Sequence, residues 1–374
     1  MKILQILPEL GSGGVERTTV DVARALIAGQ HAAHVASAGG PLAADIEAMG
    51  GVHHQLPLAS KNPLVWRRSA AAIAGIIRAH DIDIVHARSR APAHPALWAA
   101  RRTGVKFLTT YHGIYNANNG LKRRYNAVMA RGDLIIANSE FTKAHITQEH
   151  GTCSDKIIAI PRGVDLAQFT LDIPPARITA IRKHWGVEPS ERVLLLPGRL
   201  TRWKGQDVAI KAMSGIEDLT LVIQGDAQGR ERYAAELAAL IKSSGARVII
   251  APPHKDMPAA YAASFGALSA STDPEAFGRV TAEACAMGVP VIATSHGGSI
   301  EILDGGGDGK PALGLLATPS DISSLHAQIQ TLAAMRPEKA RRFAQAAQTR
   351  ARSKFTNHAM CSATLDVYRR LMGE

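Results

Sequence analysis

Short apolar runs alternate with longer amphipathic segments along almost the whole chain. The short runs have the length of buried strands, and the longer segments repeat apolar residues at helical spacing. In the first half, the predicted strands are 3–7, 33–37, 82–86, 106–111 and 133–138, and the predicted helices are 15–28, 69–80, 95–102 and 141–150. This alternation favours parallel sheets with helices on both faces.

The pattern begins again after a polar, proline-bearing stretch at residues 163–175. Its second round predicts strands at 192–197, 219–224, 247–251, 266–269 and 289–294, and residues 337–372 are helical in pattern. A chain of 374 residues is too long for one ordinary core, so we expect two doubly wound domains of about 170–190 residues. In such sheets, ligands bind in the loops beyond the carboxyl ends of the strands.

Positive charge is concentrated in one part of the chain. Residues 61–131 hold thirteen Lys and Arg against two Asp, which equals the net charge of +11 of the whole protein. A basic zone of this kind indicates a polyanionic neighbour, such as anionic lipid headgroups or a phosphorylated lipid-linked glycan. No nucleic-acid recognition module accompanies the charge, so no nucleic-acid partner is expected. A solvated arginine-rich surface is the alternative.

Several classes of protein are disfavoured by what the sequence lacks. No signal peptide and no apolar run of about 20 residues is present, which argues against secretion and membrane spanning. The three cysteines, Cys153, Cys285 and Cys361, are few and far apart, so neither a disulfide framework nor a zinc spacing is expected. We therefore expect a cytoplasmic protein. The histidines His31, His34, His53, His54 and His326 are interpreted as structural.

A glycine turn, Gly11 to Gly14, follows the first predicted strand. The dinucleotide-binding fingerprint would need glycine at position 16, where this chain has Glu16, and no acidic residue stands at the end of the second strand. A dehydrogenase is therefore disfavoured. A glycine turn at this place is also common in any α/β protein.

Residues 273–283 are the most informative stretch. They contain a carboxylate in a polar loop (Glu275), a glycine where a helix can begin (Gly278) and a second carboxylate within that helix (Glu283). The free N–H groups of a helix start attract phosphate, and carboxylates accept hydrogen bonds from sugar hydroxyls. The stretch therefore suits a molecule that is part diphosphate and part polyol, namely a nucleotide sugar.

With seven residues between them, Glu275 and Glu283 resemble the two-glutamate motif of the retaining glycosyltransferases of family four, of the lipopolysaccharide and exopolysaccharide hexosyltransferase type. Three further pieces resemble that family: residues 11–16, residues 198–205 and residues 161–165. The resemblance implies the GT-B fold, an α/β architecture of two doubly wound parallel-sheet domains that face a cleft, with a C-terminal helix that crosses back to the first domain. The implied domains are an acceptor-side domain at 1–167, a nucleotide-sugar domain at 168–355 and the crossing helix at 356–374.

The resemblance also implies the site residues. Glu275, His112, Arg199 and Lys204 would be catalytic, since two cations beside a helix start can balance the charge of a departing diphosphate without a metal. The implied donor-binding residues are Gly13, Gly14, Arg199, Lys204, Gly225, Asp226, Pro252, Glu275, Phe277, Gly278, Arg279 and Glu283. Acceptor or membrane contact is expected at Lys122, Arg123, Arg124 and Arg162, and Arg162 departs from the asparagine that is commoner in the family.

The implied function is retaining transfer of a mannose- or glucose-type hexose from a UDP- or GDP-linked donor to a glycan hydroxyl, with no cofactor and no obligatory metal. The acceptor would be lipid-linked, in lipopolysaccharide core or exopolysaccharide synthesis, and the enzyme would lie at the cytoplasmic face of the membrane. Two alternatives stay open. A nucleotide-sugar epimerase shares the architecture, and a polyanion- or nucleic-acid-binding protein would rest on the charge alone.

Overall fold

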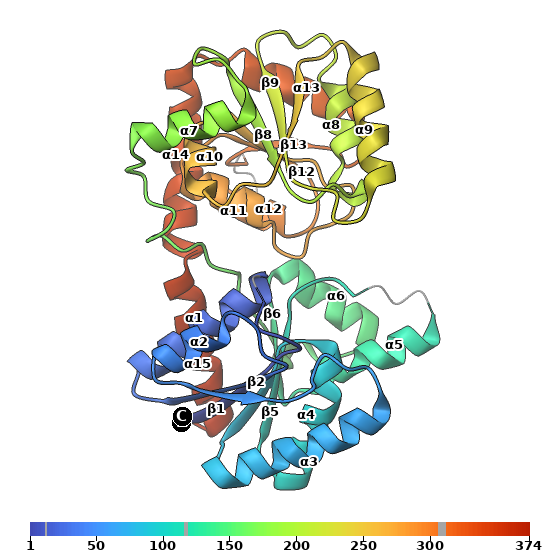
Figure 1. The fold of residues 1–374 in the computed structure, drawn as a ribbon, viewed down its shortest axis with the longest axis vertical. Coiled ribbons are helices and arrows are strands. Elements are labelled where there is room, and N and C mark those ends of the chain that lie inside the picture. The colour runs from blue at the N-terminus through green and yellow to red at the C-terminus, as the bar shows by residue number, and fades with distance from the viewer. Residues whose placement is uncertain (12, 116–118, 306–311) are drawn as a thin grey trace. The chain divides into compact units, whose positions relative to one another are not determined.

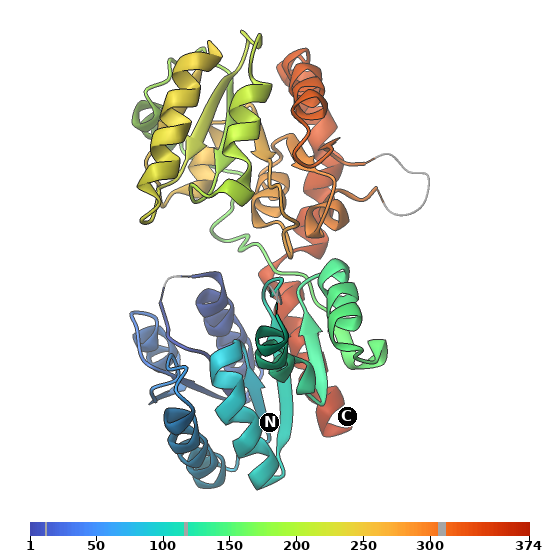
Figure 2. The same ribbon diagram turned by 90° about the vertical axis from the view of Figure 1, so that its right-hand side faces the viewer.

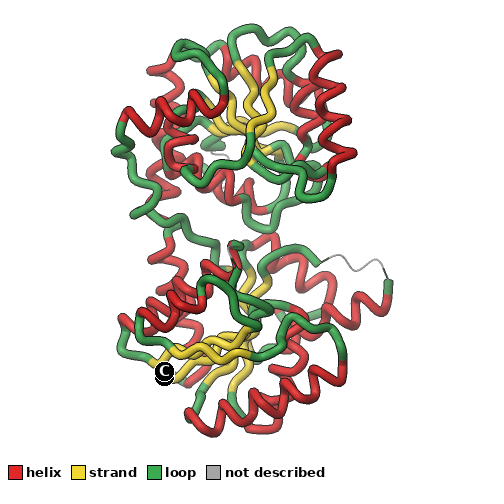
Figure 3. The backbone as a smooth tube through the Cα atoms, in the orientation of Figure 1, coloured by secondary structure: helices red, strands yellow, loops and turns green. Residues whose placement is uncertain are grey.

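The computed structural model describes residues 1–11, 13–115, 119–305 and 312–374. Contacts divide the chain into two compact units: unit 1 comprises residues 1–162 and 357–374, and unit 2 comprises residues 163–356. Each unit has one central sheet with helices on both faces (Figures 1 and 3). No described helix is both long and apolar enough to cross a bilayer.

Unit 1 contains a seven-stranded parallel sheet in the order β3-β2-β1-β4-β5-β6-β7. Its strands are β1 Lys2–Ile6, β2 Ala32–Ser37, β3 Val52–Gln55, β4 Ile84–Ala87, β5 Lys106–Tyr111, β6 Leu134–Ala137 and β7 Ile157–Ala159. Its helices are α1 Gly14–Ala28, α2 Ala43–Ala48, α3 Pro63–His80, α4 Arg90–Thr103, α5 Gly120–Asn126, α6 Glu140–His150 and α15 Asn357–Met372, with 3-10 turns η1 Ala127–Arg131 and η2 Ser154–Lys156.

Alternation along each strand divides the core of unit 1 between the two faces of the sheet. Leu4 of β1 belongs to a buried cluster that includes residues of α3 and α4. Its neighbour Ile3 belongs to a second cluster, which includes residues of α1 and α15. Successive side chains of a strand point to opposite faces, so a strand that is apolar throughout is buried on both sides.

The C-terminal segment belongs to both units. Residues 337–372 read as one helical pattern, but the structure has two helices, α14 Pro337–Lys354 in unit 2 and α15 in unit 1. The break lies at Phe355 and Thr356, where Val164 donates its backbone N–H to the Phe355 carbonyl. Beyond it, α15 runs beside α1 (Figure 2). The expected return of the final helix to the first domain is confirmed.

Unit 2 contains a six-stranded parallel sheet in the order β10-β9-β8-β11-β12-β13. Its strands are β8 Val193–Pro197, β9 Thr220–Gln224, β10 Val248–Ala251, β11 Gly266–Ser269, β12 Val291–Thr294 and β13 Leu315–Ala317. Its helices are α7 Pro175–Trp185, α8 Gln206–Ala212, α9 Glu231–Ser244, α10 Met257–Ala262, α11 Arg279–Ala286, α12 Gly298–Leu303, α13 Ile322–Ala333 and α14, with the 3-10 turn η3 Arg202–Lys204. Two parallel-sheet α/β domains are thus confirmed.

Candidate functional site

A buried ion pair lies at the carboxyl edge of the unit 2 sheet. Glu275 is in the loop from β11 to α11, and its Oε1 accepts a hydrogen bond from Lys204 Nζ at 2.7 Å. Ser271 Oγ donates to the same oxygen at 2.5 Å, and Ser269 Oγ at 3.3 Å. The side chains of Lys204 and Glu275 are only 14% and 11% exposed. All these bonds fall on Oε1, and Oε2 takes none of them.

Two opposing effects act on the pKa of Glu275. Burial raises it, but the charge of Lys204 and the hydrogen bonds from Lys204, Ser271 and Ser269 together outweigh burial, so the pKa lies below its ordinary value. Glu275 is therefore an anion at neutral pH, and Lys204 is the cation that balances it.

Gly278 caps α11 in a conformation that requires glycine. Its φ of 97° and ψ of 60° lie in the left-handed region, and a Cβ built there would stand 2.5 Å from Ser299 Oγ. Phe277 is buried directly before it. The first N–H groups of α11 thus follow the Glu275 loop, as the phosphate-binding prediction requires.

Glu283 is buried inside α11 and already has protein partners. Its Oε1 accepts hydrogen bonds from Arg279 Nη2 at 2.7 Å and from Nε at 3.1 Å, and its Oε2 accepts one from Tyr261 Oη at 3.1 Å. The charge of Glu283 raises the pKa of Arg279 above its ordinary value. These bonds fix the carboxylate, while further lone pairs on it stay available to hydroxyl donors.

The loops after β8 and β9 lie side by side. Gly198 donates its N–H to the Gln224 carbonyl at 3.0 Å, and Leu200 donates to the Asp226 carbonyl at 2.8 Å. A Cβ on Gly225 would overlap the carbonyl oxygen of Gly198, so glycine is required for this approach.

Arg199, between them, is exposed, and its guanidinium makes no hydrogen bond or ion pair with any residue the structure describes. Pro252 follows β10, the next strand of the sheet, and its carbonyl accepts a hydrogen bond from His184. The predicted donor residues of unit 2 therefore follow the carboxyl ends of four adjacent strands, β10, β9, β8 and β11.

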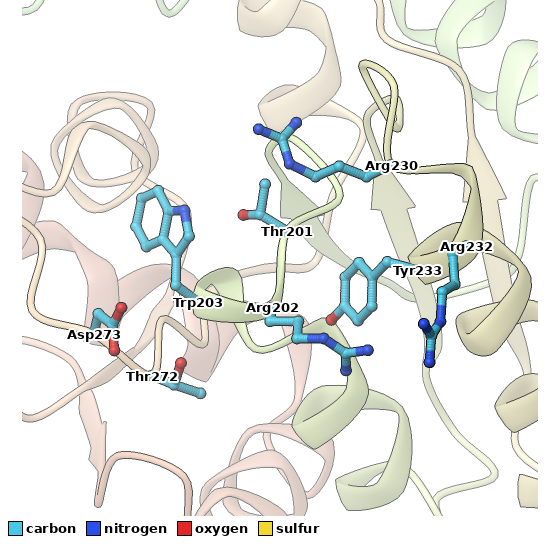
Figure 4. A pocket seen from close by; sticks show the side chains of 8 residues that line it. All are labelled: Thr201, Arg202, Trp203, Arg230, Arg232, Tyr233, Thr272 and Asp273. Carbon is cyan, nitrogen blue, oxygen red and sulfur yellow. The ribbon is translucent and has the colours of Figure 1, made fainter.

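A pocket of about 790 Å³ is formed by residues of the loops around η3, α9 and β11 (Figure 4). It is lined by Thr201, Arg202, Trp203, Arg230, Arg232, Tyr233, Thr272 and Asp273. Lys204 Nζ lies 4.5 Å from the centre of the Trp203 ring, which joins the pocket to the ion pair. The sequence prediction missed these lining residues. Two signals could have found them. Trp203 is an aromatic residue directly before Lys204, in the loop after β8, and Arg230 and Arg232 follow the end of β9.

In unit 1, His112 follows the carboxyl end of β5. Both ring nitrogens are buried and have no hydrogen-bond partner among the described residues. Burial, followed by the charges of Arg162 and Arg88, lowers the pKa of His112 well below its ordinary value. Arg162 Nη2 also donates to the His112 carbonyl at 3.4 Å. The neutral imidazole thus lies in a field of positive charge.

The glycine turn before α1 is shaped by Glu16. Gly13 is the N-cap of α1 and Gly14 its first residue, and a Cβ on Gly13 would overlap the Glu16 carboxylate. The backbone of this turn therefore accommodates an acidic side chain that folds back on it, which is consistent with glycine at position 13.

The basic residues 122–124 lie exposed on α5, where Arg123 Nε pairs with Glu149 Oε1 at 2.8 Å. Beside α5, the Trp66 and His94 rings stack with their centres 4.4 Å apart, and the His94 and Tyr125 rings with theirs 5.1 Å apart. Arg162 donates a hydrogen bond to the His112 carbonyl. Of the four residues expected to contact acceptor or membrane, three therefore lie on α5 and one bonds to the residue that follows β5.

Comparison with known proteins gives a consistent result for both units. Residues 12–168 match the family model "Glycosyltransferase Family 4", and residues 177–350 match "Glycosyl transferases group 1". A glycosyltransferase structure from Rickettsia africae is 32% identical, with a TM-score of 0.88 over 99% of this chain and 98% of that one. The Anabaena protein Alr3699/HepE in complex with UDP-glucose is 25% identical, with a TM-score of 0.82 over 99% of this chain and 100% of that one.

A relative from Xylanimonas cellulosilytica, named D-inositol 3-phosphate glycosyltransferase, is 30% identical over 61% of this chain. The alignment spans 60% of that relative's length. The similarity to these relatives concerns glycosyltransferases in general and is not specific to lipopolysaccharide synthesis.

Proposed function

Since the chain belongs to the GT-B glycosyltransferases, we propose that it transfers a hexose from a nucleoside-diphosphate sugar to an acceptor hydroxyl. The observation that carries this proposal is the buried Lys204–Glu275 pair beside the N-terminus of α11. It combines a fixed carboxylate for sugar hydroxyls with positive charge for a diphosphate.

The transfer needs charge stabilisation at the leaving group. When the bond from C1 to the diphosphate breaks, its electron pair goes to the diphosphate oxygen. Lys204, the exposed Arg199 and the first N–H groups of α11 stabilise this charge. The acceptor oxygen forms the new bond to C1, and its proton passes to the diphosphate. Departure and attack on one face of the sugar retain the anomeric configuration. On this account, no metal is obligatory.

Within unit 2, Glu275 binds the hexose hydroxyls, because its Oε2 takes none of the three hydrogen bonds that fix Oε1. Glu283 binds the ribose hydroxyls with the lone pairs that Arg279 and Tyr261 leave. The UDP-glucose complex of the Anabaena protein supports a UDP-linked glucose-type donor, and GDP-linked mannose is the alternative.

The acceptor carries a phosphate group, in our proposal, because Arg162 and Arg88 create positive potential around His112 at the carboxyl edge of the unit 1 sheet. The Xylanimonas relative is named for an inositol phosphate, which is consistent with this chemistry. A lipid-linked phosphoglycan has the same anionic group. Residues 122–124, with the exposed Leu121 and Trp98, would then contact an anionic membrane surface.

The donor site can be tested by calorimetry with UDP and GDP, with and without chelator. Lys204→Met and Glu275→Gln are compared with Lys242→Met and Glu338→Gln, which alter exposed residues of unit 2. We expect micromolar binding of one nucleotide that persists in chelator, is at least tenfold weaker in Lys204→Met and is unchanged in the controls. Failure of both nucleotides to bind at millimolar concentration would overturn the proposal.

The acceptor and the reaction are tested separately, with the favoured nucleotide sugar and either inositol 3-phosphate or a lipid-linked phosphoglycan. Transfer to one of them, with the product's anomeric configuration read by NMR, supports the proposal. A changed sugar on an intact nucleotide, without acceptor, would indicate an epimerase instead. Binding to any DNA duplex, with affinity that falls steeply with salt, would indicate a polyanion-binding protein.

A further inference from the structure

Three histidines from separate elements of unit 1 converge on one point. His34 lies in β2, His54 in β3, and His80 is the last residue of α3. Each offers one ring nitrogen, and these three nitrogens all lie within 4.8 Å of one another. His34 Nδ1 and His54 Nε2 are 3.1 Å apart, at hydrogen-bond distance. Among the described residues, this is the group of His, Cys, Asp and Glu side chains with the spacing of metal ligands.

The backbone fixes this convergence. In the parallel register of β2 and β3, His34 pairs with Val52 and Ala36 pairs with His54, so His34 and His54 project from the same face of the sheet. His80 continues the buried stripe of α3 at helical spacing from Ile73 and Ile77, and that stripe covers the same face. The register of β2 and β3 and the position of His80 on α3 therefore bring the three rings together.

The three imidazole rings pack against one another. The ring centres of the three histidines are 4.7 to 5.4 Å apart. The ammonium group of Lys2 is paired with Asp81 at 3.2 Å. The cluster thus consists of three imidazoles, with the Lys2 ammonium paired to Asp81 nearby. No carboxylate of a described residue forms a hydrogen bond with the three rings.

We propose that His34, His54 and His80 bind one late first-row divalent metal ion, of which Zn²⁺ is the reference case, with water as the fourth ligand. Neutral imidazole is a preferred ligand for Zn²⁺, Cu²⁺ and Ni²⁺. Bonds of about 2.0–2.1 Å in a tetrahedron place the ligand nitrogens roughly 3.3 Å apart, close to the 3.1 Å between His34 Nδ1 and His54 Nε2. A shift of roughly 1.5 Å by one imidazole closes the widest separation.

The bound ion would link α3 to β3, the edge strand of the sheet. His80 ends the helix that leads to the start of β4, whereas His112 follows the carboxyl end of β5. The metal site therefore lies away from the strand ends that carry the candidate functional residues. Its effect would be on the stability of unit 1, since an ion that binds only the folded state stabilises it in proportion to RT ln(1 + [L]/Kd).

The test uses the full chain without a polyhistidine tag, stripped with chelator and titrated with Zn²⁺ by calorimetry. We expect one site of micromolar or tighter Kd, at least tenfold weaker in His80→Gln and in His34→Gln. The matched control is His53→Gln, because His53 neighbours His54 but bonds to Ser37 on the opposite face. Zn²⁺ should also raise the Tm of the wild type and of the control, but not that of His80→Gln.

Co²⁺ provides a second measurement, because a tetrahedral site gives intense visible bands that Zn²⁺ then displaces. Circular dichroism and nucleotide binding show whether each variant is folded, and His80→Gln keeps the test valid if His34→Gln fails to fold. Two results would overturn the proposal. One is the absence of Zn²⁺ binding below millimolar concentration, and the other is equal affinity in wild type and in folded His80→Gln.

Discussion

Lys204 and Glu275, which are 71 positions apart in the chain, form a 2.7 Å ion pair with both side chains largely buried. Removal of one partner leaves an uncompensated buried charge, which costs about 3–5 kcal/mol. We therefore expect Lys204→Met to lower the free energy of unfolding of unit 2 by about 3 kcal/mol at neutral pH. Lys204→Met/Glu275→Gln should recover most of this loss, because it removes both charges.

The same pair predicts a pH dependence. The pKa of Glu275 in the folded wild type is below its unfolded value, so its contribution is fully present above about pH 4.5 and is lost as pH falls through the folded pKa. In Lys204→Met, burial raises that pKa instead. The stability difference between wild type and variant should therefore widen as pH rises from 4.5. Denaturant unfolding from pH 4.5 to 8 measures it, and a difference that does not vary with pH contradicts the account.

Much of the fold follows from the sequence, and the strands that it missed share one property. Strand β5 spans the predicted residues 106–111, because it is a central strand whose residues after Lys106 are β-branched, aromatic or apolar and all buried. The missed strands β3, β7 and β13 each lie at the edge of a sheet. Strand β3 reads Val-His-His-Gln and has no apolar run, whereas β7 and β13 are apolar but have only three residues each, which is short for a strand signal.

The site could be predicted in part. Glu275, Gly278 and Glu283 are close in sequence, so their spacing around a helix start was readable. The partners of these carboxylates could not be predicted from the sequence. Lys204 and Tyr261 belong to other elements, which only the folded sheet brings next to Glu275 and Glu283. The histidine cluster shows the same limit. The positions 34, 54 and 80 have no ligand spacing along the chain, and it is the register of β2 and β3 that joins them.

Gly278→Ala should damage the start of α11. The substitution adds a Cβ at φ 97° and places it 2.5 Å from Ser299 Oγ, so strain and overlap together should cost about 2–3 kcal/mol. Gly215→Ala is the matched control, because Gly215 has φ 74° with nothing within 4 Å of its added Cβ. We expect that control to lose only about 1 kcal/mol and to keep its nucleotide affinity. Denaturant unfolding measures both losses. If Gly278→Ala and Gly215→Ala lose the same free energy of unfolding, the overlap with Ser299 is not the cause.

Glu283→Gln and Tyr261→Phe separate binding from stability. The amide cannot hold Arg279 as a charged pair and accepts hydroxyl hydrogen bonds less strongly, so nucleotide affinity should fall about tenfold. Tyr261→Phe removes one hydrogen bond but keeps the carboxylate, so it should lower the free energy of unfolding by about 1 kcal/mol with little change in affinity. Calorimetry and denaturant unfolding on both variants decide this, and the reverse pattern would exclude a ligand role for Glu283.

His112→Phe should separate stability from activity. Both ring nitrogens of His112 are buried without a partner, and an unsatisfied buried polar group costs about 1–3 kcal/mol, so the ligand-free variant should be as stable as wild type or more stable. We propose that His112 is catalytic, so transfer activity should fall at least a hundredfold when the ring nitrogen that would bond substrate is lost. His94→Phe is the contrast, since His94 Nε2 already has the Tyr125 carbonyl as partner. Retained activity in His112→Phe would make His112 structural.

A buried hydrogen-bond chain joins the C-terminal helix to the sheet of unit 1. His86 Nδ1 and Tyr368 Oη lie 2.7 Å apart, and His86 Nε2 and Thr110 Oγ1 lie 2.6 Å apart, so β4, β5 and α15 are joined in unit 1. Tyr368→Phe keeps the ring and its packing but leaves His86 Nδ1 buried and unpaired, which should cost about 1–3 kcal/mol.

Because α15 is a single terminal helix of unit 1, the loss should appear as local opening of that helix. Hydrogen exchange measures it: amides of residues 357–372 should exchange faster in Tyr368→Phe than in wild type, whereas those of α14 should not change. Tyr233→Phe, which alters a buried tyrosine hydroxyl of unit 2, controls for a general effect of such a substitution. Unchanged exchange in α15 would mean that apolar packing on α1, and not this hydrogen-bond chain, holds the helix in place.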